Sequence, residues 1–192
     1  MSEGPTRPRP RRRAVFVDRD GTLMPDLHYL ADPEAAELAS GVGDALRLFH
    51  QHDYLVICVT NQSGVGRGLF SEETVHRIHR RLNEKLRPYG AAVDAFYYCP
   101  HTPEQHCDCR KPGTALFARA AEDWAIDFPT SAIVGDRLAD VEAGARLGLF
   151  TILIPEVAHE MLVNQELSER GIRPDVRVLS FGAAAAAVLH RG

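Results

Sequence analysis

The sequence predicts a single α/β domain, Rossmann-like in the general sense that a parallel β-sheet has helices on both faces. Short apolar runs alternate along the chain with longer segments whose apolar residues recur at helical spacing. Buried strands that alternate with amphipathic helices are typical of parallel sheets. A length of 192 residues is enough for one domain with a full hydrophobic core.

Short apolar runs are expected to form the strands. The first, 14–18, is continuous and brief, as in strands that are buried on both faces. The second, 55–60, is rich in β-branched residues, which favour strands. The expected strands are 14–18, 55–60, 93–98, 132–134, 150–154 and 176–179.

Helices are expected between these strands. One helix begins after Ser71, a suitable N-cap, and ends at Gly90. Ser180 is a candidate cap for the last, alanine-rich helix. The apolar faces of the first two helices contain Val42, Ala45, Leu46 and Phe49, and Val75, Ile78, Leu82 and Leu86. The remaining helices are expected near 116–124, 138–147 and 161–169.

We expect residues 1–13 to form a disordered basic tail and residues 14–192 to form the domain. The first segment is rich in Pro and Arg and has no apolar period. Its run 11–13, three arginines, could contact nucleic acid or a membrane surface, but a solvated charged tail is the preferred interpretation.

Composition excludes several classes of protein. A formal net charge of −4 argues against a general polyanion binder, so an anionic substrate would need a few local cations. No apolar run has the length of a membrane span, and the N-terminus has no secretory apolar core. We therefore expect a cytoplasmic protein that binds neither nucleic acid nor membranes. The sequence shows no heptad pattern, which favours a monomer.

Two carboxylates follow the first strand. Asp18 and Asp20 are two residues apart, so an extended backbone would point both the same way, and Gly21 allows a sharp turn after them. Their mutual repulsion requires a cation or a shared proton, and Mg²⁺ prefers such oxygen ligands. One carboxylate could attack phosphorus while the other transfers a proton. Taken alone, the motif could equally be a simple turn.

Three further polar motifs occur at or near strand ends or before helices. Thr60-Asn61-Gln62-Ser63-Gly64 suits a phosphate cradle, although a polar loop would have similar residues. Arg110 and Lys111 are adjacent cations that can bind phosphate oxygens. Asp136 follows the strand 132–134 and could complete a cation site, whereas Asp140 could act there or be a surface residue.

Together these four motifs, in this order, resemble those of the haloacid dehalogenase-like phosphohydrolases over nearly all of residues 14–154. The resemblance implies that Asp18 is the nucleophile and Asp20 the general acid and base. It implies that Thr60 and Lys111 bind the transferring phosphoryl group. It also implies that Mg²⁺ is held by Asp18, the backbone carbonyl of Asp20, and Asp136.

A compact cluster of metal-ligand residues precedes Arg110. Cys99, His101, Cys107 and Cys109 offer three thiolates and one imidazole, a closed tetrahedral set that favours a structural Zn²⁺ ion. The spacing differs from that of nucleic-acid zinc fingers. Zinc bound here would stiffen the loop that carries the phosphate-binding cations.

The cysteine loop resembles the branch of this family that contains D-glycero-D-manno-heptose 1,7-bisphosphate 7-phosphatases and histidinol-phosphate phosphatases, which have no large cap domain. We expect a sugar bisphosphate as substrate, with histidinol phosphate as the alternative and a non-enzymatic zinc-stabilised binding module as a third hypothesis. The resemblance implies substrate or phosphate contacts from Asp26, Tyr29, Thr60, Asn61, Gln62, Ser63, Arg67, Arg110, Lys111 and Arg137.

Overall fold

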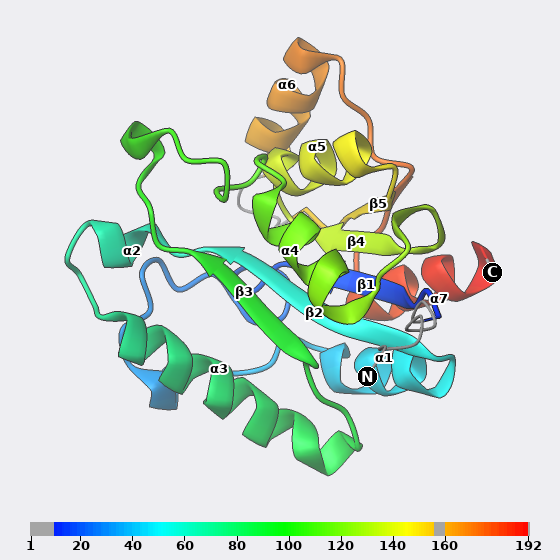
Figure 1. The fold of residues 1–192 in the computed structure, drawn as a ribbon, viewed down its shortest axis with the longest axis horizontal. Coiled ribbons are helices and arrows are strands. Elements are labelled where there is room, and N and C mark those ends of the chain that lie inside the picture. The colour runs from blue at the N-terminus through cyan, green and yellow to red at the C-terminus, as the bar shows by residue number, and fades with distance from the viewer. Residues whose placement is uncertain (1–9, 156–159, 192) are drawn as a thin grey trace, which may run out of the picture.

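The computed structural model describes residues 10–155 and 160–191. One sheet of six strands forms the centre of the fold, in the order β3-β2-β1-β4-β5-β6, and every neighbouring pair is parallel (Figure 1). The strands are β1 (Arg13–Val17), β2 (Tyr54–Asn61), β3 (Ala95–Cys99), β4 (Ala132–Gly135), β5 (Phe150–Leu153) and β6 (Val176–Arg177).

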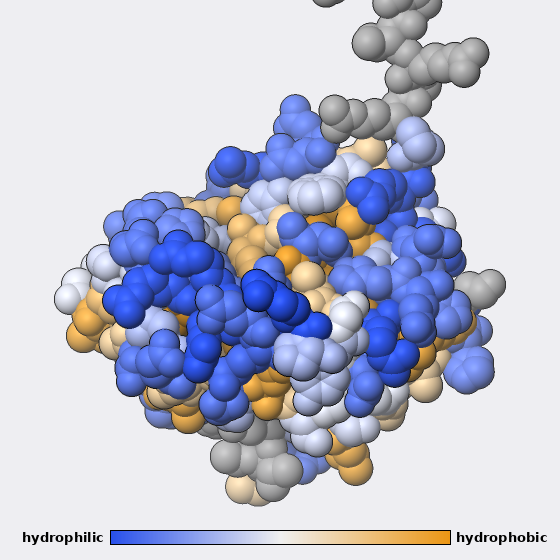
Figure 2. Space-filling view, turned by 90° about the horizontal axis from the view of Figure 1, so that it is seen from below, coloured by the Kyte–Doolittle hydropathy of each residue, from blue (hydrophilic) through white to orange (hydrophobic). Residues whose placement is uncertain are grey.

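Helices cover both faces of this sheet. The α-helices are α1 (Val42–Gln51), α2 (Ser63–Gly66), α3 (Glu72–Leu86), α4 (Ala115–Trp124), α5 (Leu138–Leu147), α6 (Glu160–Arg170) and α7 (Phe181–Arg191). Short 3₁₀ turns lie at Pro33–Ala35, Arg87–Tyr89, Pro103–Gln105 and Phe128–Thr130. Seen from the side of α1 and α3, hydrophilic residues cover most of the surface, with apolar residues in smaller areas between them (Figure 2).

The alternation of side chains along β1 explains the two layers. Val15 and Val17 belong to a buried cluster that includes residues of α1 and α7. Ala14 and Phe16 point to the opposite face and pack in a second cluster with α4 and with Ala143 of α5. A fully buried Val or Phe side chain contributes about 1.5–3 kcal/mol to folding. The expected α/β fold, with a parallel sheet between helical layers, is confirmed.

The chain reverses its direction of progress across the sheet after β3. It forms β1, β2 and β3 outward in one direction and then returns to place β4 on the other side of β1. In open parallel sheets, ligands bind beyond the carboxyl ends of the strands at such a switch point. Between residues 18 and 111, all of which are described, the chain forms no separate cap domain.

The N-terminal boundary differs from the prediction. We expected the tail to extend through residue 13, but Arg13 begins β1 and pairs in register with Tyr54. The Arg13 guanidinium also lies over the Tyr54 ring. Arg11 forms an ion pair of 2.7 Å with Asp127. Residues 11–13 are therefore part of the domain, whereas residues 1–9 of the predicted tail lie outside the described residues.

Smaller differences concern single elements. The third strand begins at Ala95 rather than residue 93, because the Asp94 carboxylate accepts the Val56 N–H at 2.7 Å and replaces a backbone partner at that point. β6 is shorter than expected, and α2 forms at Ser63–Gly66, where no helix was predicted. No helix within the described parts of the chain is long and apolar enough to cross a membrane.

Candidate active site

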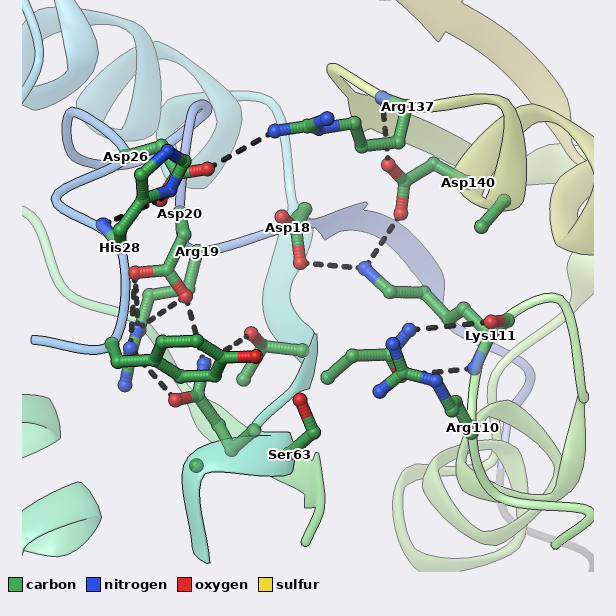
Figure 3. Close-up of a pocket in the computed structure, with 16 residues that line it drawn as sticks. Asp18, Arg19, Asp20, Asp26, His28, Ser63, Arg110, Lys111, Arg137 and Asp140 are labelled. Atoms are coloured by element: carbon green, nitrogen blue, oxygen red, sulfur yellow. Dashed lines mark hydrogen bonds and ion pairs between the residues drawn. The ribbon is translucent and has the colours of Figure 1, made fainter. Parts of the chain in front are cut away.

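A polar cavity of about 670 Å³ opens at the carboxyl ends of β1, β2 and β4 (Figure 3). It collects residues from four distant segments of the chain. Among its lining residues are the predicted Asp18, Asp20, Asp26, Tyr29, Thr60, Asn61, Gln62, Ser63, Arg110, Lys111 and Arg137. The structure thus brings together nearly all the side chains that the sequence motifs indicated.

Lys111 lies at the base of this cavity between two carboxylates. Its ammonium group is 2.6 Å from Asp18 Oδ1 and 2.6 Å from Asp140 Oδ1. All three side chains are buried. Burial alone would lower the pKa of Lys111, but attraction to Asp140 and Asp18 outweighs this effect, so the pKa is raised and the ammonium stays charged. Asp140 is therefore a buried member of the site and not a surface residue.

The pKa of the Asp18 carboxyl lies above its ordinary value. Burial raises its pKa to about 6, and repulsion from Asp140 and Asp20 acts in the same direction, while Lys111 opposes them. Such a group becomes a full carboxylate when positive charge is added beside it.

The pKa of Asp136 is raised further than that of Asp18. Burial and repulsion from Asp18 and Asp140 raise its pKa to about 8. Its Oδ2 accepts a hydrogen bond of 2.9 Å from Arg137, but its buried Oδ1 has no hydrogen-bond partner among the described residues. One carboxylate oxygen from each of Asp18, Asp136 and Asp140 lies within 4.8 Å of the others. The buried oxygen set fits a small hard cation such as Mg²⁺.

The Asp20 carboxylate lies outside this group of three. It accepts hydrogen bonds from Arg19 Nε at 3.1 and 3.2 Å and from Gln62 Nε2 at 2.7 Å. Gln62 Nε2 also donates to Thr60 Oγ1 at 2.9 Å. The family resemblance assigns the backbone carbonyl of Asp20, and not its carboxylate, to the metal, and that assignment stays a prediction.

Arg19 lines the cavity although the motifs did not indicate it as a site residue. Its side chain is 1% exposed, and its Nη2 donates to Gln62 Oε1 at 2.9 Å. Its place between two aspartates was visible in the sequence. An extended chain puts Arg19 on the opposite side from Asp18 and Asp20, however, and guanidinium groups are rarely buried without partners that only folding can supply.

Two predicted contacts have other partners in the structure. Arg67 is not in the described lining of the cavity, and its Nη2 instead lies 3.8 Å from Glu104 on the exposed loop. Arg137 does line the cavity, but its charge is shared by Asp136 at 2.9 Å and Asp26 at 3.0 Å. A substrate phosphate would therefore have to compete with two carboxylates for Arg137.

The cysteine cluster forms a second candidate metal centre beside the cavity. The sulfur atoms of Cys99, Cys107 and Cys109 lie 3.1–3.5 Å from one another, and His101 Nδ1 lies 3.2 Å from the Cys109 sulfur. All three are free thiols. Four ligand atoms this close, with no acidic residue among them, fit a tetrahedral ion that prefers sulfur and nitrogen.

The cluster touches the cation-bearing loop. Arg110 Nη1 is 3.5 Å from the carbonyl oxygen of His101, and Arg110 and Lys111 follow Cys109 directly. The Arg110 side chain thus contacts the backbone of a predicted metal ligand, as expected if a bound metal stiffens the loop that carries Arg110 and Lys111.

The HAD-hydrolase-like family model matches residues 108–180. A D-glycero-beta-D-manno-heptose-1,7-bisphosphate 7-phosphatase of Haemophilus ducreyi is 42% identical over 147 residues, which cover 73% of this chain and 81% of the relative. The chain belongs to the HAD-hydrolase-like family. This membership confirms the resemblance that the strand-end motifs indicated.

Other members of the family agree with the fold and the site. The phosphatase of that name from Rhodopseudomonas palustris is 37% identical over 147 residues, covering 73% of this chain and 82% of the relative. A solved structure, the D,D-heptose 1,7-bisphosphate phosphatase of B. bronchiseptica complexed with magnesium and phosphate, superimposes with a TM-score of 0.81. It is 29% identical and covers 94% of this chain and 99% of its own. Membership in this hydrolase family supports an enzyme and not a binding module.

Proposed function

We propose that this protein is a Mg²⁺-dependent D-glycero-D-manno-heptose 1,7-bisphosphate 7-phosphatase. The observation that carries the chemistry is the buried Asp18–Lys111–Asp140 arrangement beside Asp136 at the base of the cavity. It combines a nucleophile, a cation for phosphoryl oxygens and a set of oxygen ligands in one place. The names of the two relatives described above support the sugar bisphosphate as substrate.

The residues divide the reaction between them. Asp18 attacks phosphorus, and the bond from phosphorus to the ester oxygen breaks, leaving an aspartyl phosphate. Asp20 donates a proton to the departing oxygen and then removes one from the water that hydrolyses the intermediate. Lys111 binds a phosphoryl oxygen throughout. Phosphoryl transfer depends mainly on such positioning and charge neutralisation.

Two metals complete the proposal. Asp18 and Asp136 would hold Mg²⁺, which when bound supplies positive charge to the phosphoryl oxygens. The Oδ1 of Asp136, which has no hydrogen-bond partner in the described parts of the chain, supports this assignment. The Cys/His cluster would hold a structural Zn²⁺, because its four ligands leave no position for a reacting molecule.

The second phosphate of the substrate needs its own cation. The resemblance implies that Arg67 and Arg110 both contact substrate or phosphate, which makes them the candidates for this role. Only Arg110 of these two lies in the described lining of the cavity, so we assign the uncleaved phosphate to Arg110. Histidinol phosphate has one phosphate and would not use this contact, and no observation favours it over the bisphosphate.

Phosphate release tests the proposal. The purified protein would be assayed with both anomers of heptose 1,7-bisphosphate and with histidinol phosphate, with and without Mg²⁺, beside an Asp18→Asn variant. We expect Mg²⁺-dependent release from the bisphosphate that the variant loses. Turnover of histidinol phosphate alone would replace the substrate assignment. Turnover that survives in the variant would refute Asp18 as nucleophile.

A further inference from the structure

The side chain of Asn61 is bound to the backbone of Lys111. Asn61 Nδ2 donates to the Lys111 carbonyl oxygen at 3.2 Å, and the Lys111 N–H donates to Asn61 Oδ1 at 2.9 Å. The carboxamide therefore pairs with Lys111 as a neighbouring strand would. This pair joins the last residue of β2 to the loop that follows the cysteine cluster, 50 positions along the chain.

Residues of β2 bind both the backbone and the ammonium group of Lys111. The ammonium group donates to the carbonyl oxygen of Val59 at 2.6 Å, in addition to its ion pairs with Asp18 and Asp140. A lysine has a flexible four-carbon stem, so the place of its charge depends on where its backbone is fixed. Asn61 fixes the backbone, and the Val59 carbonyl helps to fix the tip.

We propose that Asn61 is a positioning residue that places Lys111, and not a substrate contact as its motif suggested. The inference rests on the proposed function, in which Lys111 binds the transferring phosphoryl group. Asn61 acts through Lys111, so its loss would lower turnover and weaken the binding of phosphate-like anions together. The carboxamide has one acceptor oxygen and two N–H bonds, and the Lys111 backbone uses the oxygen and one N–H.

The chain contains a matched control for this contact. Asn83 near the end of α3 donates to the Val93 carbonyl oxygen at 3.1 Å and accepts the Val93 N–H at 2.7 Å. The pattern is the same as that of Asn61, and neither Asn83 nor Val93 lines the cavity. Equal substitutions at the two sites should therefore cause similar losses of stability but different losses of function.

The test compares Asn61→Leu with Asn83→Leu, and Asn61→Asp with Asn83→Asp. Leucine keeps the shape without charge or hydrogen bonds, and aspartate keeps the acceptor but loses the donor. We expect kcat/KM to fall by about tenfold to a hundredfold in both Asn61 variants, as for a small misplacement of a catalytic group. Competitive inhibition by orthovanadate should weaken by a similar factor. The Asn83 variants should keep both values.

Several results would overturn the proposal. One is equal kcat/KM and equal orthovanadate inhibition in the two Leu variants. Another is a loss confined to Asn61→Asp, which would indicate charge repulsion and not positioning. The amide of Lys111 should also exchange hydrogen faster in Asn61→Leu than in the wild type, and unchanged exchange would contradict the contact.

The same experiment separates this inference from the proposed function. If the wild type hydrolyses none of the phosphate esters, the proposed function fails by itself. Calorimetric binding of inorganic phosphate and amide exchange at Lys111 then still compare Asn61→Leu with Asn83→Leu. Weaker phosphate binding and faster exchange in the Asn61 variant alone would support positioning, and equal values would refute it.

Discussion

Without Mg²⁺, the folded protein should lose stability as pH rises from 6 to 8. Burial and two neighbouring carboxylates raise the pKa of Asp136 from an ordinary value of 3.8 to about 8. Over this interval the folded state holds a proton on Asp136 that the unfolded state has released. A folded state that binds more protons becomes less stable as pH rises, by about 1.4 kcal/mol per pH unit for one proton.

The magnitude follows from the two pKa values. Asp136 is almost fully protonated at pH 6 and about half ionised at pH 8, so the loss is roughly 2 kcal/mol over this interval. For a chain of this length, that corresponds to a fall in Tm of about 4–8 °C. The Asp18 carboxyl, with a pKa of about 6, is half ionised at pH 6, and the rest of its titration adds about 0.4 kcal/mol to the loss.

Thermal unfolding in buffers without added Mg²⁺ measures the effect. The Asp136→Asn variant should lose most of the pH dependence, because asparagine has a similar shape and does not titrate. Added Mg²⁺ should stabilise the wild type more at pH 8 than at pH 6, because protons compete with the cation for the carboxylates. An equal fall in Tm in the wild type and the variant would refute the assignment of this pH dependence to Asp136.

Three further changes have defined expectations. Gly21→Ala should unfold at a lower temperature than Gly148→Ala. Both glycines have a φ of 70–79°, but of the two only Gly21 would place a Cβ against the Asp136 carboxylate. Equal losses of Tm would show that this overlap is relieved without cost. Arg67→Ala should leave the KM for the bisphosphate unchanged, since Arg67 is not in the described lining of the cavity, and a severalfold rise would restore it to the site. Cys109→Ser should reduce bound zinc, measured by elemental analysis, and lower kcat/KM; full zinc content would contradict the four-ligand site.

The strand pattern was predictable because it depends on local chemistry. A strand buried on both faces needs a continuous apolar run, and a helix against a sheet needs an apolar stripe, so both leave a mark in neighbouring residues. α2 was not predicted, because its four residues make little more than one helical turn and cannot show a repeating apolar pattern. Arg13 was assigned to the tail because its cross-strand partner Tyr54 lies far away in the sequence.

The candidate site was predictable in its parts. Polar residues at strand ends were expected to meet, because the carboxyl ends of parallel strands lie at one edge of the sheet. The direction of each charged side chain was not predictable. Arg137 turns to Asp26, more than 100 positions away, and Arg67 turns toward Glu104.

The sequence alone determined the fold class, the family, the order of the motifs and the residue set of the cysteine cluster, because each depends on residue type and short spacing. Only the tertiary structure decided which partner each polar group takes. The burial of Arg19, the ion pair of Asp140 with Lys111 and the pairing of Asn61 with the Lys111 backbone join distant segments or require a dry interior. Buried polar groups must find hydrogen-bond partners, and only the folded chain determines which partners are within reach.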